Sequence, residues 1–127
     1  MNKILLIIIL SLVSLSTEAE TITERLKKLP PEEWVYQALT VVDVAQTMRA
    51  LDHPCGCYYE ANSLYGKNPS DFQLVATSLA FNAAHAYLVL RMVETGQPEW
   101  LIKTVTYTSI AVRAGVVYHN FSIGIRF

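Results

Sequence analysis

The sequence has few charged residues and almost no net charge. Only 17% of its 127 residues are charged, whereas 52% are hydrophobic; an average soluble domain has about 25% charged residues. The formal net charge of -1 provides neither the basic surface that holds a nucleic acid nor an acidic tail. The composition therefore predicts one compact, apolar unit, and it excludes nucleic acid from the expected partners.

Cysteine is also scarce. Cys55 and Cys57 are the only two cysteines, which is too few for a disulfide framework and too close together for an unstrained bridge. We expect free thiols, or a bridge to a second chain. The Cys-x-Cys spacing differs from redox and structural zinc motifs, and His53, His85 and His119 do not complete a ligand cluster. We therefore expect no metal and no other cofactor.

Recognisable catalytic motifs are absent as well. The sequence has no nucleophile elbow, phosphate-binding loop, zincin motif or dinucleotide fingerprint. It has no internal repeat and no low-complexity tract. An enzyme is therefore disfavoured, and we expect His85 to be a structural histidine on a helix rather than a member of a catalytic triad.

Residues 1–19 have the pattern of a signal peptide. Lys3 provides the positive charge, residues 4–15 form the apolar region, and Ala19 precedes the expected cleavage point. Because Glu18 is unusual in such a signal, the alternative is an uncleaved anchor that adds one more membrane span.

A polar leader and three apolar segments follow. The leader, residues 20–33, is expected at the membrane surface, and prolines and glutamates at its end predict a helix start. Residues 34–51, 72–93 and 100–118 are apolar segments close to the length of about 20 residues that a membrane span needs. The sequence thus predicts an all-α fold, a small antiparallel helical membrane bundle of three spans occupying residues 34–127.

Polar side chains in these segments fall on single helix faces. A lone charge at the bilayer centre costs on the order of 3 kcal/mol, so Asp43 and Arg113 are expected to pair, with Asn82 and His85 nearby. We call the predicted set the polar seam: Asp43, Thr47, Asn82, His85 and Arg113. Two interpretations stay open, a site that binds a small molecule or moves a proton, and an ion pair that only fixes helix register.

The loop before the second apolar segment holds a further candidate. Glu60 and Asn62 place a carboxylate and an amide two residues apart, where they can line a ligand or cap backbone donors of the turn. Ser70 is a natural N-cap for the helix that follows, with Asp71 in its first turn.

Short motifs in the first helix, the loop and the end of the chain resemble those of one family. They are Asp43-x-x-x-Thr47, Glu60-x-Asn62-Ser63-Leu64-x-Gly66, Asn68-Pro69-Ser70 and His119-Asn120. This succession is similar to a family of small bacterial and phage-borne integral membrane proteins of unknown function, whose loop pattern resembles Glu-x-Asn-Pro-Leu. Here Ser63 replaces the proline. The resemblance implies a three-helix membrane protein, favours Asp43, Thr47, Glu60 and Asn62 as site residues, and implies no reaction.

The sequence therefore predicts a small inner-membrane protein that acts by binding or by partner interaction through the polar seam. Its expected partners are the lipid bilayer, a second copy of itself or another membrane protein, because small residues form ridges that allow close helix contact. The ridges are Ala76, Ala80 and Ala84 in one segment and Ala111 and Gly115 in another. The alternatives are a soluble periplasmic or secreted helical bundle, and a membrane-embedded enzyme or proton-coupled carrier that uses Asp43 and His85.

Overall fold

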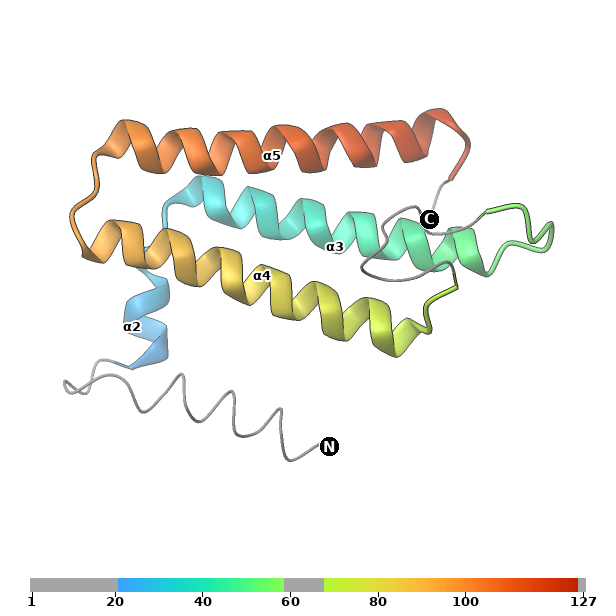
Figure 1. Cartoon of the computed structure of the whole chain (residues 1–127), viewed down its shortest axis with the longest axis horizontal. Helices are drawn as coiled ribbons and strands as arrows, with labels where there is room; N and C mark the ends of the chain where they lie inside the picture. The colour runs from blue at the N-terminus through green and yellow to red at the C-terminus, as the bar shows by residue number, and fades with distance from the viewer. Residues whose placement is uncertain (1–20, 59–67, 126–127) are drawn as a thin grey trace.

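The computed structural model describes residues 21–58 and 68–125, and within these ranges it contains helices and no strands (Figure 1). The helices are α2 (Ile22–Leu26), α3 (Pro31–Leu51), α4 (Asp71–Glu94) and α5 (Glu99–Ser122). The predicted all-α fold is confirmed. The predicted signal peptide, Glu60 and Asn62 lie outside the described residues.

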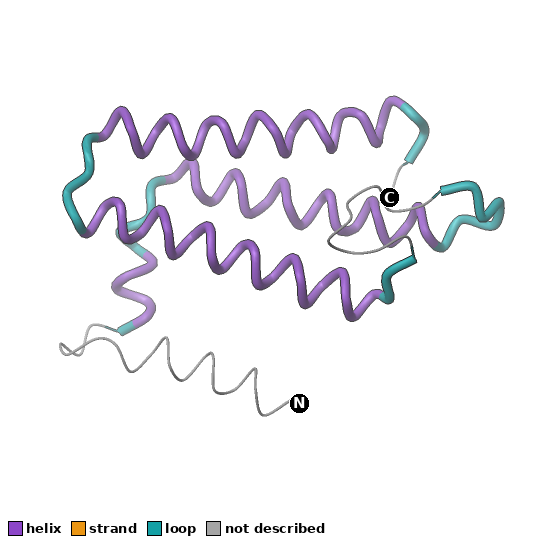
Figure 2. The backbone as a smooth tube through the Cα atoms, viewed as in Figure 1, coloured by secondary structure: helices purple, strands orange, loops and turns teal. Residues whose placement is uncertain are grey.

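The three long helices pack side by side as a bundle. Helices α3 and α5 both pack against α4 and against each other, and each helix runs antiparallel to the next along the chain (Figures 1 and 2). The connection from α4 to α5 is tight because Gly96 adopts a φ of 69°, a left-handed conformation that glycine tolerates best. This short turn makes α4 and α5 antiparallel neighbours, as the sequence predicted.

Local sequence signals set where the helices begin. Helix α3 starts with Pro31 in its first turn, followed by Glu32 and Glu33, as predicted. At α4, the backbone N–H of Gln73 donates to Ser70 Oγ over 3.2 Å, and the Ser70 N–H donates to Gln73 Oε1 over 2.9 Å. This reciprocal capping box confirms the predicted N-cap.

A small apolar core lies at the end of the bundle where α2 docks. Leu29, Val89 and Leu90 are buried together there, with partly buried side chains of α4 and α5 around them. Arg25 holds α2 against the end of α4 through two hydrogen bonds of 3.1 Å to the Glu94 carboxylate. The polar leader is therefore packed onto the bundle by an apolar contact and an ion pair.

Elsewhere the bundle has polar groups inside and large apolar groups outside. The buried polar side chains are Glu33, Thr40, Gln46, Ser78 and Thr106. By contrast, Phe72 is 78% exposed, Trp100 is 67% exposed and Leu79 is 64% exposed. Single exposed apolar residues are ordinary in soluble proteins. The combination of buried polar groups with many exposed apolar side chains is unusual for them.

Hydropathy supports one membrane span rather than the three that were predicted. Among the described residues, α4 alone is long and apolar enough to qualify, and 22% of its apolar segment is buried inside the bundle. Helices α3 and α5 fall short because polar and charged side chains such as Gln46, Asp43 and Arg113 lower their mean hydropathy. The predicted length of α5 was also too short, since the helix continues to Ser122.

The capping box gives a first test of the fold. Replacing Ser70 by alanine should lower the free energy of unfolding by about 1 kcal/mol, because the first turn of α4 loses a hydrogen-bond acceptor. Denaturant unfolding, followed by far-UV circular dichroism, measures the change. Thr108→Ala, at an exposed helical position of α5, is the matched control and should cause no loss. Equal stability of both variants would contradict the role of the cap.

Candidate functional site

Three helices contribute one side chain each to a hydrogen-bonded chain inside the bundle. His85 Nδ1, on α4, lies 2.9 Å from Oε2 and 3.1 Å from Oε1 of Glu33, on α3. His85 Nε2 lies 2.8 Å from the hydroxyl oxygen of Ser109, on α5. Glu33 is completely buried. We call Glu33, His85 and Ser109 the relay cluster.

Neighbouring side chains hold the relay cluster in place. Gln37 Nε2 donates to Glu33 Oε1 over 2.6 Å and to the backbone carbonyl of Asn82 over 3.2 Å. The ring of Tyr36 stacks on the imidazole at a centroid distance of 4.1 Å. Among the described residues, Glu33 Oε2 and Asn82 Oδ1 are buried without a well-aligned hydrogen-bond donor, although Oε2 contacts the imidazole. These two oxygens can therefore accept further hydrogen bonds.

The Ser109 hydroxyl has two acceptors within reach. One is the Val105 carbonyl oxygen, 2.9 Å away, and the other is His85 Nε2, 2.8 Å away. Which of the two it donates to depends on the tautomer of the imidazole. This arrangement of carboxylate, imidazole and hydroxyl is that of an acid–base relay.

The sequence pattern did not predict this cluster. His85 was expected in the polar seam beside Asp43 and Arg113, either in a site that binds a small molecule or moves a proton or as a structural histidine. Glu33 was expected only to complement the helix dipole. The spacing of Glu33, Tyr36, Thr40 and Asp43 is three, four and three residues, which places Glu33 on the same helix face as the polar seam. That spacing was the feature of the sequence that could have placed Glu33 with the interior polar residues.

The expected ion pair of the polar seam is present farther along the bundle. Arg113 Nη1 lies 2.5 Å from Asp43 Oδ2, and the amide of Asn120 donates to Asp43 Oδ1 over 3.3 Å. The same amide donates to Gln46 Oε1 over 3.2 Å. Gln46 is completely buried and was not placed in the predicted seam. We call Asp43, Arg113, Asn120 and Gln46 the ion-pair cluster.

Tyr36 connects the two clusters. Its ring stacks on His85 and lies below the Arg113 guanidinium, whose central carbon is 5.8 Å from the ring centroid. Of the predicted seam, Asp43 and Arg113 therefore belong to the ion-pair cluster, His85 belongs to the relay cluster, and Asn82 lies next to the relay cluster. The ring of Tyr36 lies between the two clusters and contacts both.

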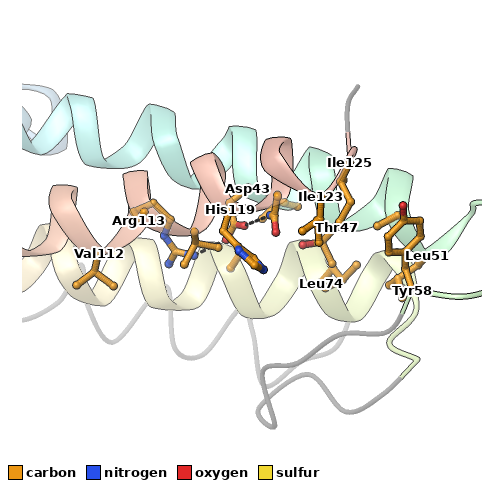
Figure 3. A pocket seen from close by; sticks show the side chains of 16 residues that line it. Asp43, Thr47, Leu51, Tyr58, Leu74, Val112, Arg113, His119, Ile123 and Ile125 are labelled. Atoms are coloured by element: carbon orange, nitrogen blue, oxygen red, sulfur yellow. Dashed lines mark hydrogen bonds and ion pairs between the residues drawn. The ribbon is translucent and has the colours of Figure 1, made fainter.

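A cavity of about 660 Å³ opens beside the ion-pair cluster. Asp43, Arg113 and Thr47 lie on its walls together with Leu74 and other apolar side chains of the three long helices (Figure 3). Small-molecule sites usually measure about 300–1,000 Å³, with mostly apolar walls and a few polar groups. The arrangement suits a ligand with an apolar body and a polar head.

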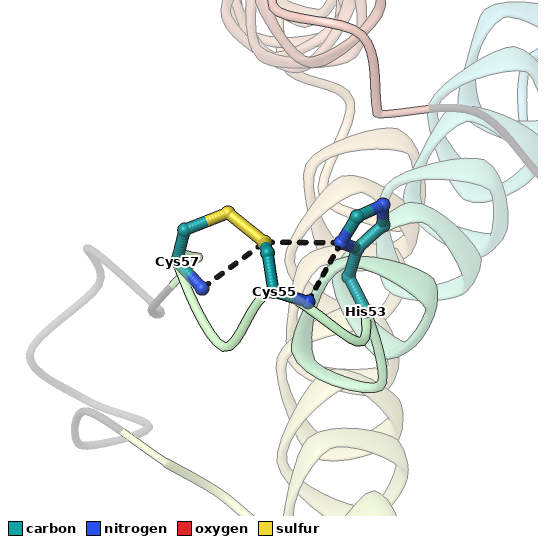
Figure 4. Close-up of a disulfide and its surroundings, with 3 residues drawn as sticks. All are labelled: His53, Cys55 and Cys57. Atoms are coloured by element: carbon teal, nitrogen blue, oxygen red, sulfur yellow. Dashed lines mark hydrogen bonds between the residues drawn. A yellow bond between two sulfur atoms is a disulfide. The ribbon is translucent and has the colours of Figure 1, made fainter.

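The cysteines are joined to each other, so the expectation of free thiols is wrong. Cys55 and Cys57 form a disulfide in the loop after α3 (Figure 4). Gly56 adopts a φ of 58°, and the turn brings the two Cα atoms to 5.1 Å, within the usual range for a bridge. The sequence separation alone did not reveal this turn geometry.

Comparison with known protein families, curated proteins and solved structures finds no match for this chain. The structure itself describes an all-α bundle with a polar interior and a cavity beside an ion pair. The family resemblance drawn from the short motifs stays a prediction.

Glu33 and its neighbour Glu32 provide a matched test of the relay cluster. Glu33→Gln should lower the free energy of unfolding by roughly 1–3 kcal/mol, because a neutral amide replaces the buried carboxylate that accepts from Gln37 and pairs with His85. Glu32→Gln should cost little, because that carboxylate accepts an exposed hydrogen bond from the Tyr107 hydroxyl, and exposed interactions contribute little to stability. Urea unfolding measures the stability of both variants. Similar values would show that the relay hydrogen bonds contribute nothing to stability.

Proposed function

We propose that this chain is an integral protein of the inner membrane that binds an amphipathic ligand in the cavity beside Asp43 and Arg113. The observation that carries the proposal is the inverted polarity of the bundle. Glu33 and Gln46 are completely buried, whereas Phe72 and Trp100 face outward. In lipid, apolar side chains face outward without cost, and ionisable groups turn to the interior and pair there.

Helix dimensions support the membrane proposal. Helices of 21 and 24 residues measure about 31–36 Å at about 1.5 Å per residue, enough for a hydrocarbon core of about 30 Å. Trp34 and Trp100 are both exposed near the N-terminal ends of α3 and α5, as expected for aromatic residues at a membrane interface. In this proposal α4 crosses the membrane, and α3 and α5 cross with it while directing their charges inward.

The chemistry of the cavity favours a ligand whose head carries both charges. The carboxylate of Asp43 can accept from an ammonium group, and the guanidinium of Arg113 can bind a phosphate. The cavity lies near the ends of α3 and α5, where a lipid headgroup would be found, and its apolar walls suit an acyl chain. Phosphatidylethanolamine has these features and is the probe of choice.

The relay cluster favours a second candidate, a proton-coupled carrier or membrane-embedded enzyme. His85 lies within hydrogen-bond distance of a carboxylate on one side and a hydroxyl on the other. Such a chain can hold and pass a proton in an interior without water. Ligand binding at Asp43 and proton exchange at His85 would then be linked through the ring of Tyr36.

Membrane association is tested by a carbonate wash of membranes that contain the expressed chain. We expect the protein to stay in the pellet. Leu79→Lys should weaken insertion, because a lysine at a helix centre costs about 2.5–3.5 kcal/mol in lipid. Gln97→Lys, in the exposed turn after α4, is the matched control and should insert normally. Release of the unmodified protein by carbonate would favour the soluble periplasmic or secreted bundle instead.

Ligand binding is tested by native mass spectrometry of protein from phosphatidylethanolamine vesicles. We expect a retained lipid, and we expect Gly115→Phe to abolish retention by filling the cavity. Gly115 lines the cavity, and an added side-chain carbon there meets no atom within 4 Å, so the substitution fits the backbone. Ala111→Phe, one turn earlier and outside the cavity wall, should retain the lipid. Equal retention by both variants would contradict binding in the cavity.

A further inference from the structure

The loop after α3 brings together three metal-binding side chains that lie outside both clusters and do not line the cavity. The ligand atoms of His53, Cys55 and Cys57 all lie within 4.8 Å of one another, and all three residues are exposed. His53 Nδ1 is 3.0 Å from Cys55 Sγ (Figure 4). Two sulfurs and one imidazole nitrogen form a donor set that zinc and other thiophilic ions prefer.

The backbone turn holds these donors on one side of the loop. The Gly56 N–H donates to the His53 carbonyl oxygen over 3.0 Å, which closes a tight turn around Pro54 and Cys55. The positive φ of Gly56 then directs Cys57 back toward Cys55. The ring of Tyr58 packs edge-on against the imidazole at 5.4 Å and limits its rotation.

The orientation of the imidazole suits metal binding. The backbone N–H of Cys55 donates to His53 Nδ1 over 3.3 Å, so Nδ1 acts as an acceptor and the ring proton resides on Nε2. The unprotonated nitrogen therefore faces the sulfurs. Neutral imidazole with a free Nδ1 is the form that binds a metal.

We propose that the reduced chain binds a thiophilic metal ion, with Zn²⁺ as the test ion, through His53 Nδ1 and the sulfurs of Cys55 and Cys57. Zinc bonds of about 2.0–2.3 Å in a tetrahedral site place ligand atoms roughly 3–4 Å apart. His53 Nδ1 already lies 3.0 Å from Cys55 Sγ, and reduction of the disulfide frees the two sulfurs to separate to that spacing. The fourth position is open to water. The disulfide form does not bind, because its sulfurs have no thiolate charge.

Switching between the two forms requires two electrons. A dithiol reductant gives two electrons and two protons to the Cys55–Cys57 bond and becomes a disulfide itself, leaving two thiols in the loop. Binding of the ion then releases the two thiol protons to water. Both cysteines are exposed, so a reductant can reach them. The disulfide closes a very short loop. In the chain-entropy model it therefore adds little to the free energy of unfolding.

The test uses the full-length protein in detergent, reduced with a phosphine and titrated with Co²⁺, a spectroscopic substitute for zinc. We expect thiolate-to-cobalt charge-transfer absorption that saturates at one ion per chain and disappears on adding Zn²⁺. The oxidised protein should show no such absorption. Cys55→Ser, Cys57→Ser and His53→Ala should each weaken binding by at least about tenfold.

His119→Ala is the matched control, since it removes an exposed imidazole from α5 and should leave the titration unchanged. Far-UV circular dichroism of each variant verifies that the helices are retained. Absence of charge-transfer absorption in the reduced protein would overturn the proposal. It would also be overturned if the absorption persisted when both cysteines are replaced, or if the oxidised protein bound the ion equally well.

Discussion

The structure depends on one constraint, that each acidic group inside the bundle must have a partner from another helix. Glu33 contacts His85 of α4, and Asp43 contacts Arg113 of α5. An unpaired ionised carboxylate in an apolar surrounding costs several kcal/mol. A slip of one helix turn would separate these partners, so the two contacts together fix the register of all three long helices.

These contacts divide the bundle into regions with different chemistry. The apolar cluster around Val89 packs the end where α2 docks, and the relay cluster follows it. Beyond Tyr36 come the ion pair and the cavity, and the loop with the disulfide lies past the end of α3. The apolar core thus lies at one end of the bundle, and the cavity and the disulfide loop lie at the other.

The polar interior also explains why, within residues 21–58 and 68–125, hydropathy favours α4 alone as a membrane span. Asp43, Gln46 and Arg113 lower the apolar character of α3 and α5, yet they face partners inside the bundle. Mean hydropathy counts every residue equally, so it does not distinguish polar side chains that face partners inside the bundle from those that are exposed.

The sequence by itself determined the all-α fold, the cap of α4 at Ser70 and the polar face of each helix, and the cost of an unpaired interior charge predicted that Asp43 would meet Arg113. Caps and faces depend on residues within one or two turns, which the order of amino acids specifies directly. Tertiary structure alone decided that Glu33, His85 and Ser109 meet, and that a turn at Gly56 joins two cysteines. Periodicity places a residue on a helix face, but the axial register between helices and the path of a loop determine which atoms come into contact.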